Sequence, residues 1–153
     1  MSIKIREATD DDLDDLARLR WQWRIDRNPA FDGTLAEFRL GFADWWSAQN
    51  GRCRAVVGTD DGRVIAMGFL ALVNRVPDPG VLLRHHGDLQ SLYVVPEHRR
   101  SGLGSRIVQA LVELARASDC DRVNVHSGRR SVALYERSGF EHFHQLMTLD
   151  LGG

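Results

Sequence analysis

Apolar residues recur along the chain with two different periods, and these periods predict its helices and strands. Spacings of three and four residues place apolar side chains on one face of a helix, whereas strict alternation is typical of a half-buried strand. The predicted helices begin near Thr9 and Thr34, and two more lie at 103–114 and 131–137. The predicted strands lie at 3–6, 54–59, 64–73, 89–95, 122–126 and 140–151.

Local signals indicate where the first two helices begin. Thr9 precedes Asp12 by three residues, which is the spacing of a capping box that satisfies free backbone N–H groups. Thr34 precedes Glu37 in the same way. We interpret the acidic run at 10–15 as a first helical turn and a solvated face, because carboxylates stabilise the positive end of a helix.

All four tryptophans of the chain fall within these two predicted helices. Trp23 and Trp45 lie on the apolar stripes, so we expect them in the core. Trp21 and Trp46 lie off the stripes, and we expect them to line an apolar pocket.

The order of elements predicts a mixed α/β fold in one domain, residues 1–153. A chain of 153 residues can bury a full core but is too short for two ordinary domains. The helix at 103–114 follows the strand at 89–95, and such a helical crossover favours a parallel neighbouring strand.

Composition limits which binding partners and which cellular compartment we expect for the protein. A net charge of −1 gives no general attraction to nucleic acid, and no apolar run approaches the length of a membrane span. Cys53 and Cys120 stand alone without metal-ligand spacing, and the chain starts with no apolar secretory segment. We therefore expect a cytoplasmic protein with reduced thiols, no metal, no nucleic acid and no membrane partner.

The join between the strand at 89–95 and the following helix carries the strongest chemical signal. Gly102 and Gly104 allow unusual dihedral angles and close backbone approach at the helix start, where free N–H groups favour anions. No lysine follows Gly104, so the loop is not a P-loop. Ile107 stands where a dinucleotide fingerprint needs a third small residue.

The pattern Arg99-x-x-Gly102-x-Gly104 resembles the acetyl-coenzyme A motif of the GNAT superfamily of N-acetyltransferases. A second block further along, Ala133-Leu134-Tyr135-Glu136-x-x-Gly139-Phe140, is similar to another conserved region of that family. The resemblance covers nearly the whole chain. It implies a single GNAT domain with a central mixed, mostly antiparallel sheet and helices on both faces, and it implies acetyl-CoA as cosubstrate without a metal.

The resemblance also implies how acetyl-CoA is held. Backbone N–H groups of the loop would bind its pyrophosphate, and the preceding strand would hydrogen-bond the pantetheine arm as an added strand. The implied loop residues are Arg99, Arg100, Ser101, Gly102, Leu103, Gly104 and Ser105. The implied strand residues are Leu92, Tyr93 and Val94, one of whose N–H groups would also polarise the thioester carbonyl.

Two catalytic roles follow from the same resemblance. Tyr135 matches a tyrosine that protonates the departing sulfur. Asp88 matches a strand carboxylate that serves as general base, with Gln90 on the same strand face to align the water or the acceptor. Asp88 also fits a simple turn before a strand, and His126 or a chain of waters is an alternative base.

The sequence departs from the family pattern at Gly128, where many relatives carry an asparagine that touches the coenzyme. Arg129 and Arg130 are candidates to replace that contact by meeting coenzyme phosphates.

We therefore expect an acetyl-CoA-dependent N-acetyltransferase that moves an acetyl group to a primary amine of a small molecule or protein by direct attack in a ternary complex. The alternative is a non-catalytic acyl-CoA-binding module, a sensor or interaction domain, which would need neither Tyr135 nor Asp88. The apolar strand predicted at 140–151 would allow a homodimer by pairing between chains.

Overall fold

The computed structural model describes residues 2–153 and confirms the four predicted helices and the first five predicted strands. The strands are β1 (Ile3–Glu7), β2 (Cys53–Asp60), β3 (Arg63–Arg75), β4 (Arg84–Val94) and β5 (Val123–Val125). The helices are α1 (Leu13–Arg27), α2 (Leu35–Gln49), α3 (Leu103–Ala117) and α4 (Val132–Arg137). Short 3-10 turns precede α1, α3 and α4. No helix in residues 2–153 is long and apolar enough to cross a membrane.

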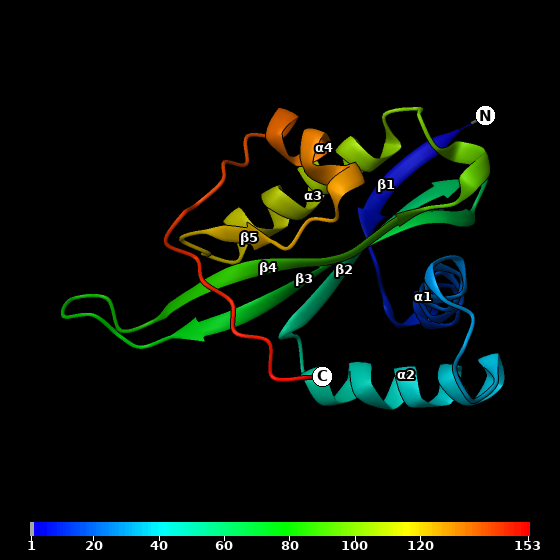
Figure 1. Ribbon diagram of the computed structural model, residues 1–153, viewed down its shortest axis with the longest axis horizontal. Coiled ribbons are helices and arrows are strands. Elements are labelled where there is room, and N and C mark those ends of the chain that lie inside the picture. The colour runs from blue at the N-terminus through cyan, green and yellow to red at the C-terminus, as the bar shows by residue number, and fades with distance from the viewer. Residues whose placement is uncertain (1) are drawn as a thin grey trace.

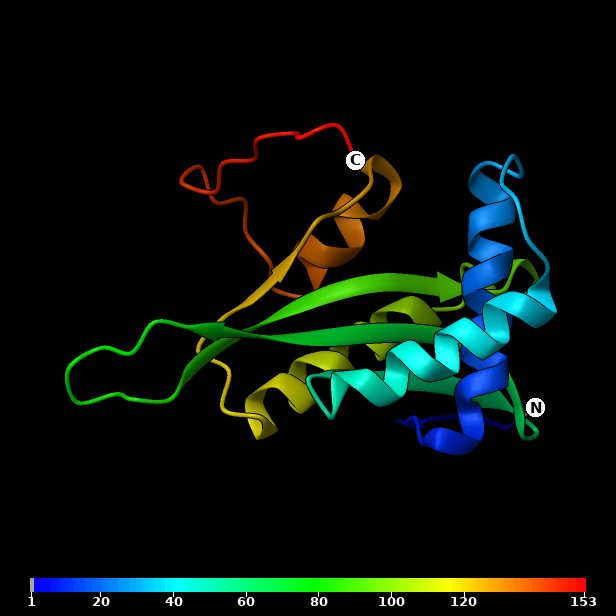
Figure 2. The ribbon, with the colours of Figure 1, turned by 90° about the horizontal axis from the view of Figure 1, so that it is seen from below.

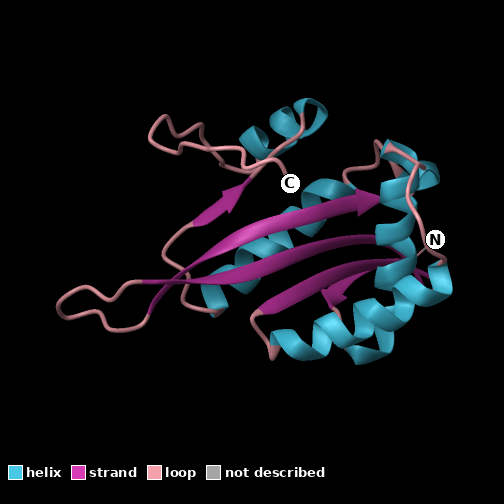
Figure 3. Cartoon of the chain, turned by 60° about the horizontal axis from the view of Figure 1, so that its bottom comes forward, coloured by secondary structure: helices cyan, strands magenta, loops and turns pink. Residues whose placement is uncertain are grey.

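The strands form one sheet in the order β1-β2-β3-β4-β5 (Figure 3). The first three pairings are antiparallel and β4 pairs with β5 in parallel, as the intervening helix α3 predicted. The hairpin of β3 and β4 is longer than the rest of the sheet and projects beyond it (Figure 1).

Helices cover both faces of the sheet: α1 and α2 lie on one side, and α3 and α4 on the other (Figure 1). Each side has its own core. Leu16, Leu19 and Phe42 pack on the first face, whereas Ile107 and Leu111 of α3 pack on the second. The mixed α/β fold predicted from the sequence is confirmed.

Gly68, in the middle of β3, lets α3 lie close to the sheet. A Cβ atom at Gly68 would stand 2.7 Å from Cδ1 of Leu111 and 3.0 Å from Cγ2 of Ile107. Cβ atoms are essentially never found 2.7 Å from a neighbouring atom, so a larger residue would force the Leu111 and Ile107 side chains of α3 to shift.

Asp12 ties the entrance of α1 to β1. Its carboxylate accepts hydrogen bonds of 2.7 and 2.8 Å from the guanidinium of Arg6, and one of 2.8 Å from the N–H of Thr9. Asp12 is 5% exposed and completes the predicted capping box with Thr9. The hydrogen bonds from Arg6 lower the pKa of this carboxyl. The acidic run is therefore partly structural and not only a solvated face.

The strand predicted at 140–151 is wrong, because residues 141–153 contain neither strand nor helix. The start of the segment lies near β5, where the guanidinium of Arg122 stands 5.1 Å from the ring centroid of Phe143, but the segment does not pair with the sheet and its end lies apart from it (Figure 2). Its apolar side chains are exposed: Phe143, Leu146, Met147, Leu149 and Leu151. An alternating pattern predicts a strand only where a neighbouring edge offers hydrogen bonds, so pairing of this segment between two chains stays a prediction.

We predict that Gly68→Ala lowers the free energy of unfolding by about 1–3 kcal/mol, because the new methyl group overpacks the contact with α3. Gly41→Ala in α2 is the control, since a Cβ there meets nothing within 4 Å and alanine favours a helix. Urea unfolding of both variants checks this. Equal stability of the two would contradict the close packing of α3 on β3.

We predict that Asp12→Asn costs about 2–3 kcal/mol of unfolding free energy at pH 7. The folded pKa of Asp12 is lowered, so its carboxylate stabilises the fold above the unfolded pKa of about 3.9, and this stabilisation disappears as the pH falls through the folded pKa.

Urea unfolding at pH 7 and at lower pH measures this difference between the wild type and Asp12→Asn. The gap should narrow below about pH 4. Asp44→Asn on the exposed side of α2 is the control and should leave the pH profile unchanged. A gap that is constant with pH would refute the ionic role of Asp12.

Candidate active site

Strand β4 loses its second neighbour halfway along its length. It pairs with β5 only at Gly87–Leu89, whereas its pairing with β3 continues to Val94. Within residues 2–153, the β5 side of β4 is thus without a strand partner over residues 90–94. An edge of this kind can hydrogen-bond an extended ligand as an added strand.

A β-bulge lies at the start of this open edge. In the register, Met67 pairs with Tyr93 and Phe69 pairs with Gln90, so two residues of β4 face Gly68 alone. One of these two, Ser91, has a positive φ of 54°. A bulge turns backbone groups away from their usual directions, which makes the N–H groups here candidates to polarise a carbonyl.

The predicted anion-binding loop follows β4 directly and opens α3. Arg100 and Gly102 both have left-handed φ angles, 63° and 80°, and Gly102 is the N-cap of α3. The hydroxyl of Ser101 donates a 2.6 Å hydrogen bond to the carbonyl of His98, which closes the turn. The first N–H groups of α3 lack partners within the helix, as at any helix start.

The side chain of Arg99 folds back onto the protein. Its Nε donates to the carbonyl oxygen of Val94 at 2.8 Å, and its guanidinium lies 3.6 Å from the carboxylate of Asp26 in α1 and over the ring of Tyr93. Asp26 also accepts a 2.9 Å hydrogen bond from the Tyr93 hydroxyl. Burial, followed by this carboxylate, raises the pKa of Tyr93 to about 12. Arg99 and Tyr93 thus join the loop, β4 and α1, and a contact of Arg99 with coenzyme stays a prediction.

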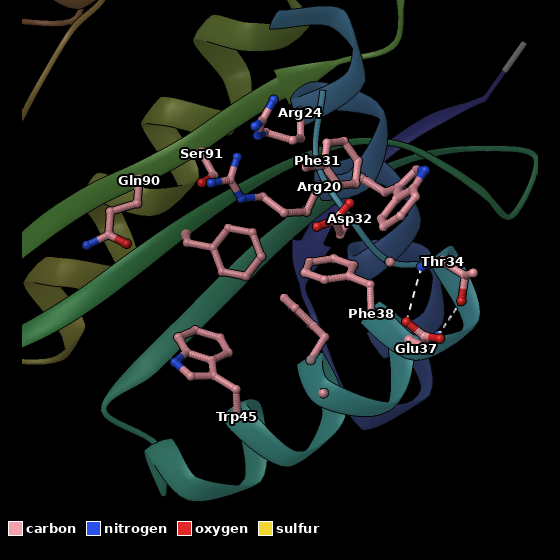
Figure 4. A pocket seen from close by; sticks show the side chains of 15 residues that line it. Arg20, Arg24, Phe31, Asp32, Thr34, Glu37, Phe38, Trp45, Gln90 and Ser91 are labelled. Carbon is pink, nitrogen blue, oxygen red and sulfur yellow. Dashed lines mark hydrogen bonds between the residues drawn. The ribbon is translucent and has the colours of Figure 1, made fainter. Parts of the chain in front are cut away.

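A cavity of about 720 Å³ opens between α1, α2 and β4, next to the bulge (Figure 4). Gln90 and Ser91 line its β4 side. The charged lining residues are Arg20, Arg24, Asp32 and Glu37. The aromatic lining residues are Trp21, Phe31, Phe38, Phe42, Trp45 and Phe69.

The structure divides the four tryptophans between core and cavity differently from the prediction. Trp21 lines the cavity and Trp23 packs against the core, as expected. Trp45 is 43% exposed and lines the cavity, whereas Trp46 packs against the core, so these two predictions are wrong. The two residues are adjacent and differ by about 100° around α2, so the rotation of the helix on the sheet decides which one is buried.

Asp88 and Gln90 lie on the same face of β4, as predicted. The side-chain amide of Gln90 donates a 2.8 Å hydrogen bond to the Asp88 carboxylate. Asn124 of β5 stands opposite Asp88 in the register. Gln90 reaches the large cavity but Asp88 is not among its lining residues, so the link between them runs through this hydrogen bond.

Tyr135 is 7% exposed and packs edge-to-face on Phe140. Burial raises the pKa of its phenol, so the group stays protonated at neutral pH and can donate a proton. It lines a smaller cavity of about 280 Å³ beside β5 and not the large one with Gln90. A Cβ at Gly104 would lie 3.1 Å from Cδ1 of Leu134, so Gly104 brings α4 close to the start of α3.

The alternative base and the departures from the family pattern all lie on exposed backbone after β5. His126, Gly128, Arg129 and Arg130 are exposed, and Gly128 is extended. Among residues 2–153, no three or more His, Cys, Asp or Glu residues are grouped as a metal site would require.

Comparison with known proteins identifies the family of the chain. A model of the acetyltransferase (GNAT) family matches residues 13–140. The chain belongs to this family. One curated relative is a glucosamine 6-phosphate N-acetyltransferase of Trypanosoma brucei brucei. It is 30% identical to the present chain over 90 residues. The chain spans 59% of the length of that relative.

Solved structures share the fold of this GNAT chain. A predicted acetyltransferase with acetyl-CoA from Clostridium acetobutylicum has a TM-score of 0.80 at 16% identity, and the match covers 98% of this chain and 97% of the other. A GCN5-related N-acetyltransferase from Ralstonia eutropha JMP134 has a TM-score of 0.75 at 24% identity, with 99% and 100% covered.

The charged lining of the large cavity was missed in the sequence. Arg20, Arg24 and Arg27 recur at helical spacing beside Trp23, which places them close together on one side of α1. That recurrence was the available signal in the sequence. It does not show which of the arginines face a cavity, because the packing of α1 on the sheet places Arg20 and Arg24 in the cavity lining and leaves Arg27 outside.

Proposed function

We propose that the protein is an acetyl-CoA-dependent N-acetyltransferase that acetylates the primary amine of a small molecule. The observation that carries the proposal is the continuity of three features along residues 90–105: an open strand edge, a bulge and an anion-binding helix start. An extended pantetheine arm that ends in a pyrophosphate has the matching order of chemical groups.

The residues present fit acetyl-CoA. The backbone groups of Leu92 and Val94 face the open edge, where the Val94 carbonyl already accepts a hydrogen bond from Arg99, whereas Tyr93 faces β3 as Val95 does. A Cβ at Gly102 would meet nothing within 4 Å, so space is free over the helix start. When bound, acetyl-CoA supplies an acetyl thioester: the amine nitrogen forms the C–N bond, the C–S bond breaks, the amine loses a proton and the thiolate takes one up.

The large cavity is the candidate acceptor site, because it reaches the bulge at Ser91 from the side of α1 and α2. An amine held there would approach a thioester that lies on the open edge of β4. The small-molecule acceptor of the Trypanosoma relative supports an acceptor of this size.

The reaction needs two proton transfers, one from the amine and one to the thiolate, and residues of β4 and α4 are the candidates for them. The carboxylate of Asp88, held by Gln90, would accept the proton of the amine directly or through water, and His126 is the alternative base. The neutral phenol of Tyr135 would donate a proton to the departing thiolate, and the contact of the adjacent Leu134 with Gly104 holds α4 near the start of α3.

We predict that the wild-type protein releases free thiol from acetyl-CoA in the presence of a suitable amine, and that Tyr135→Phe lowers kcat by roughly 10²-fold or more, the usual contribution of a general acid. Phenylalanine keeps the packing on Phe140 and removes only the hydroxyl.

A thiol assay over an amine panel measures both rates, and acetyl-CoA binding is measured in parallel. Unchanged kcat in Tyr135→Phe would exclude the acid role. Binding of acetyl-CoA without turnover on any amine would favour the acyl-CoA-binding module instead.

We also predict that Gly102→Ala raises the KM for acetyl-CoA by about tenfold, since a Cβ would stand over the anion-binding amides at a φ that L-residues avoid. Gly62→Ala is the matched control: it has a φ of 83° and equally open surroundings, but lies in the turn between β2 and β3. Both variants should lose similar stability, and only Gly102→Ala should change KM. An equal change in KM in both would mean that the loop does not bind coenzyme.

A further inference from the structure

Arg20 lines the large cavity with a positive charge that the protein does not neutralise. Its Nη1 is buried, and no hydrogen-bond acceptor within residues 2–153 meets it. Its Cζ lies over the ring of Trp23, 3.8 Å from the ring centroid, in a cation–π contact. Figure 4 shows the side chain reaching across the cavity towards Ser91 at the bulge.

The cavity lining holds a second cation, Arg24, and two carboxylates, Asp32 and Glu37, but within residues 2–153 neither carboxylate hydrogen-bonds Nη1 of Arg20. Burial lowers the pKa of its guanidinium, and the charges of Arg27 and Arg24 lower it further, but an arginine remains charged at neutral pH. Arg24 donates to the carbonyl oxygens of Asn28 and Ala30 and so is held beside the cavity. A half-buried cation without an acceptor is costly, and a ligand anion that hydrogen-bonds it would remove that cost.

The opposite wall of the cavity is aromatic. Phe38 and Phe42 lie with ring centroids 5.9 Å apart, and Phe42 and Trp45 with centroids 5.6 Å apart. Phe69 of β3 packs edge-to-face on Phe42. Such a surface gains from burying a flat apolar group, and it offers few partners to a ligand with many hydroxyl groups.

We propose that the acceptor is an α-amino acid with an aromatic side chain, and that Arg20 binds its carboxylate. In an α-amino acid the carboxylate and the amine are separated by one carbon atom. Arg20 reaches towards Ser91, so a carboxylate on Arg20 would put the amine at the bulge beside Gln90. The aromatic side chain would then lie on Phe38, Phe42 and Trp45.

This assignment rests on the proposed function, and it separates the chain from its sugar-phosphate relative. A hexosamine phosphate also carries an anion and an amine, but its ring hydroxyls need hydrogen-bond partners that the aromatic wall does not supply. The guanidinium of Arg20 can bind a carboxylate or a phosphate. The rest of the acceptor, an aromatic ring or a hydroxylated sugar ring, therefore decides which of the two fits the cavity.

The test compares L-phenylalanine with phenethylamine, which lacks only the carboxylate, in the wild type and in Arg20→Gln. In the wild type we expect kcat/KM to be higher for L-phenylalanine by roughly 10- to 100-fold, the usual effect of a hydrogen bond to a charged group. Arg20→Gln should abolish that preference, because it removes the partner of the carboxylate. Glucosamine 6-phosphate is the third acceptor and should be the poorest.

Arg27→Gln is the matched control, because Arg27 also lies over Trp23, 4.5 Å from the ring centroid, but is exposed and outside the cavity lining. It should keep the preference for L-phenylalanine. Equal losses with both amines in Arg20→Gln, or a preference of the wild type for glucosamine 6-phosphate, would overturn the assignment.

Binding separates this inference from the proposed function. Trp21 and Trp45 line the cavity, so their fluorescence reports occupancy without turnover. Binding of L-phenylalanine that weakens by roughly 10-fold or more in Arg20→Gln, but not in Arg27→Gln, supports the carboxylate site even if no acetyl transfer occurs. Turnover of other amines without any binding of L-phenylalanine would refute the site and leave the acetyltransferase intact.

Discussion

The divergence of β4 from β5 is the constraint on which the rest of the site depends. The two strands pair over only three positions, Gly87 to Leu89, and then separate, which leaves the next five residues of β4 with one neighbour. A sheet does not normally leave such an edge inside the molecule, because unpaired backbone groups are costly. A 3-10 turn, Pro96–His98, and a short loop connect this edge to the start of α3, where further N–H groups are free. The open edge and the helix start are therefore neighbouring sets of backbone groups, and we propose that an extended ligand uses both.

Packing on the two faces of the sheet holds this edge in place. Gly68 admits α3 to the second face and stands opposite the bulge at Ser91, so one small residue serves both the close contact and the change of register. On the first face, Asp26 of α1 accepts a hydrogen bond from the Tyr93 hydroxyl and forms an ion pair with Arg99. These two contacts join α1 to β4 and to the loop. Helix α1, which forms one wall of the large cavity, is therefore tied directly to the predicted anion-binding loop. A half-buried, unneutralised Arg20 in that wall is the kind of local cost that proteins keep at binding sites.

Most of the architecture could be predicted from local patterns. The capping boxes at Thr9 and Thr34 and the apolar stripe of α3 are short-range signals, and the structure has each of them where the sequence placed it. The predictions failed where a residue's state depends on a distant neighbour. Trp45 and Trp46 exchanged roles because the rotation of α2 on the sheet is set by contacts with Phe69. Residues 140–151 alternate like a strand, yet within the described chain they do not pair with the free outer edge of β5. The partner of Asp12, Arg6, could not be inferred from helix capping alone.

Local sequence signals are enough to predict the proposed coenzyme-binding segment. The spacing of Arg99, Gly102 and Gly104 after an apolar strand specifies a strand, a left-handed turn and a helix start within one continuous segment, and such a segment needs only local geometry. The acceptor side was decided by tertiary structure alone. Its wall combines α1, α2, β3 and β4, and whether Arg20 faces a cavity, Trp23 or solvent follows from how these elements pack. Whether a charged side chain can bind a ligand depends on its burial and on the groups around it, and these come from residues far apart in the chain.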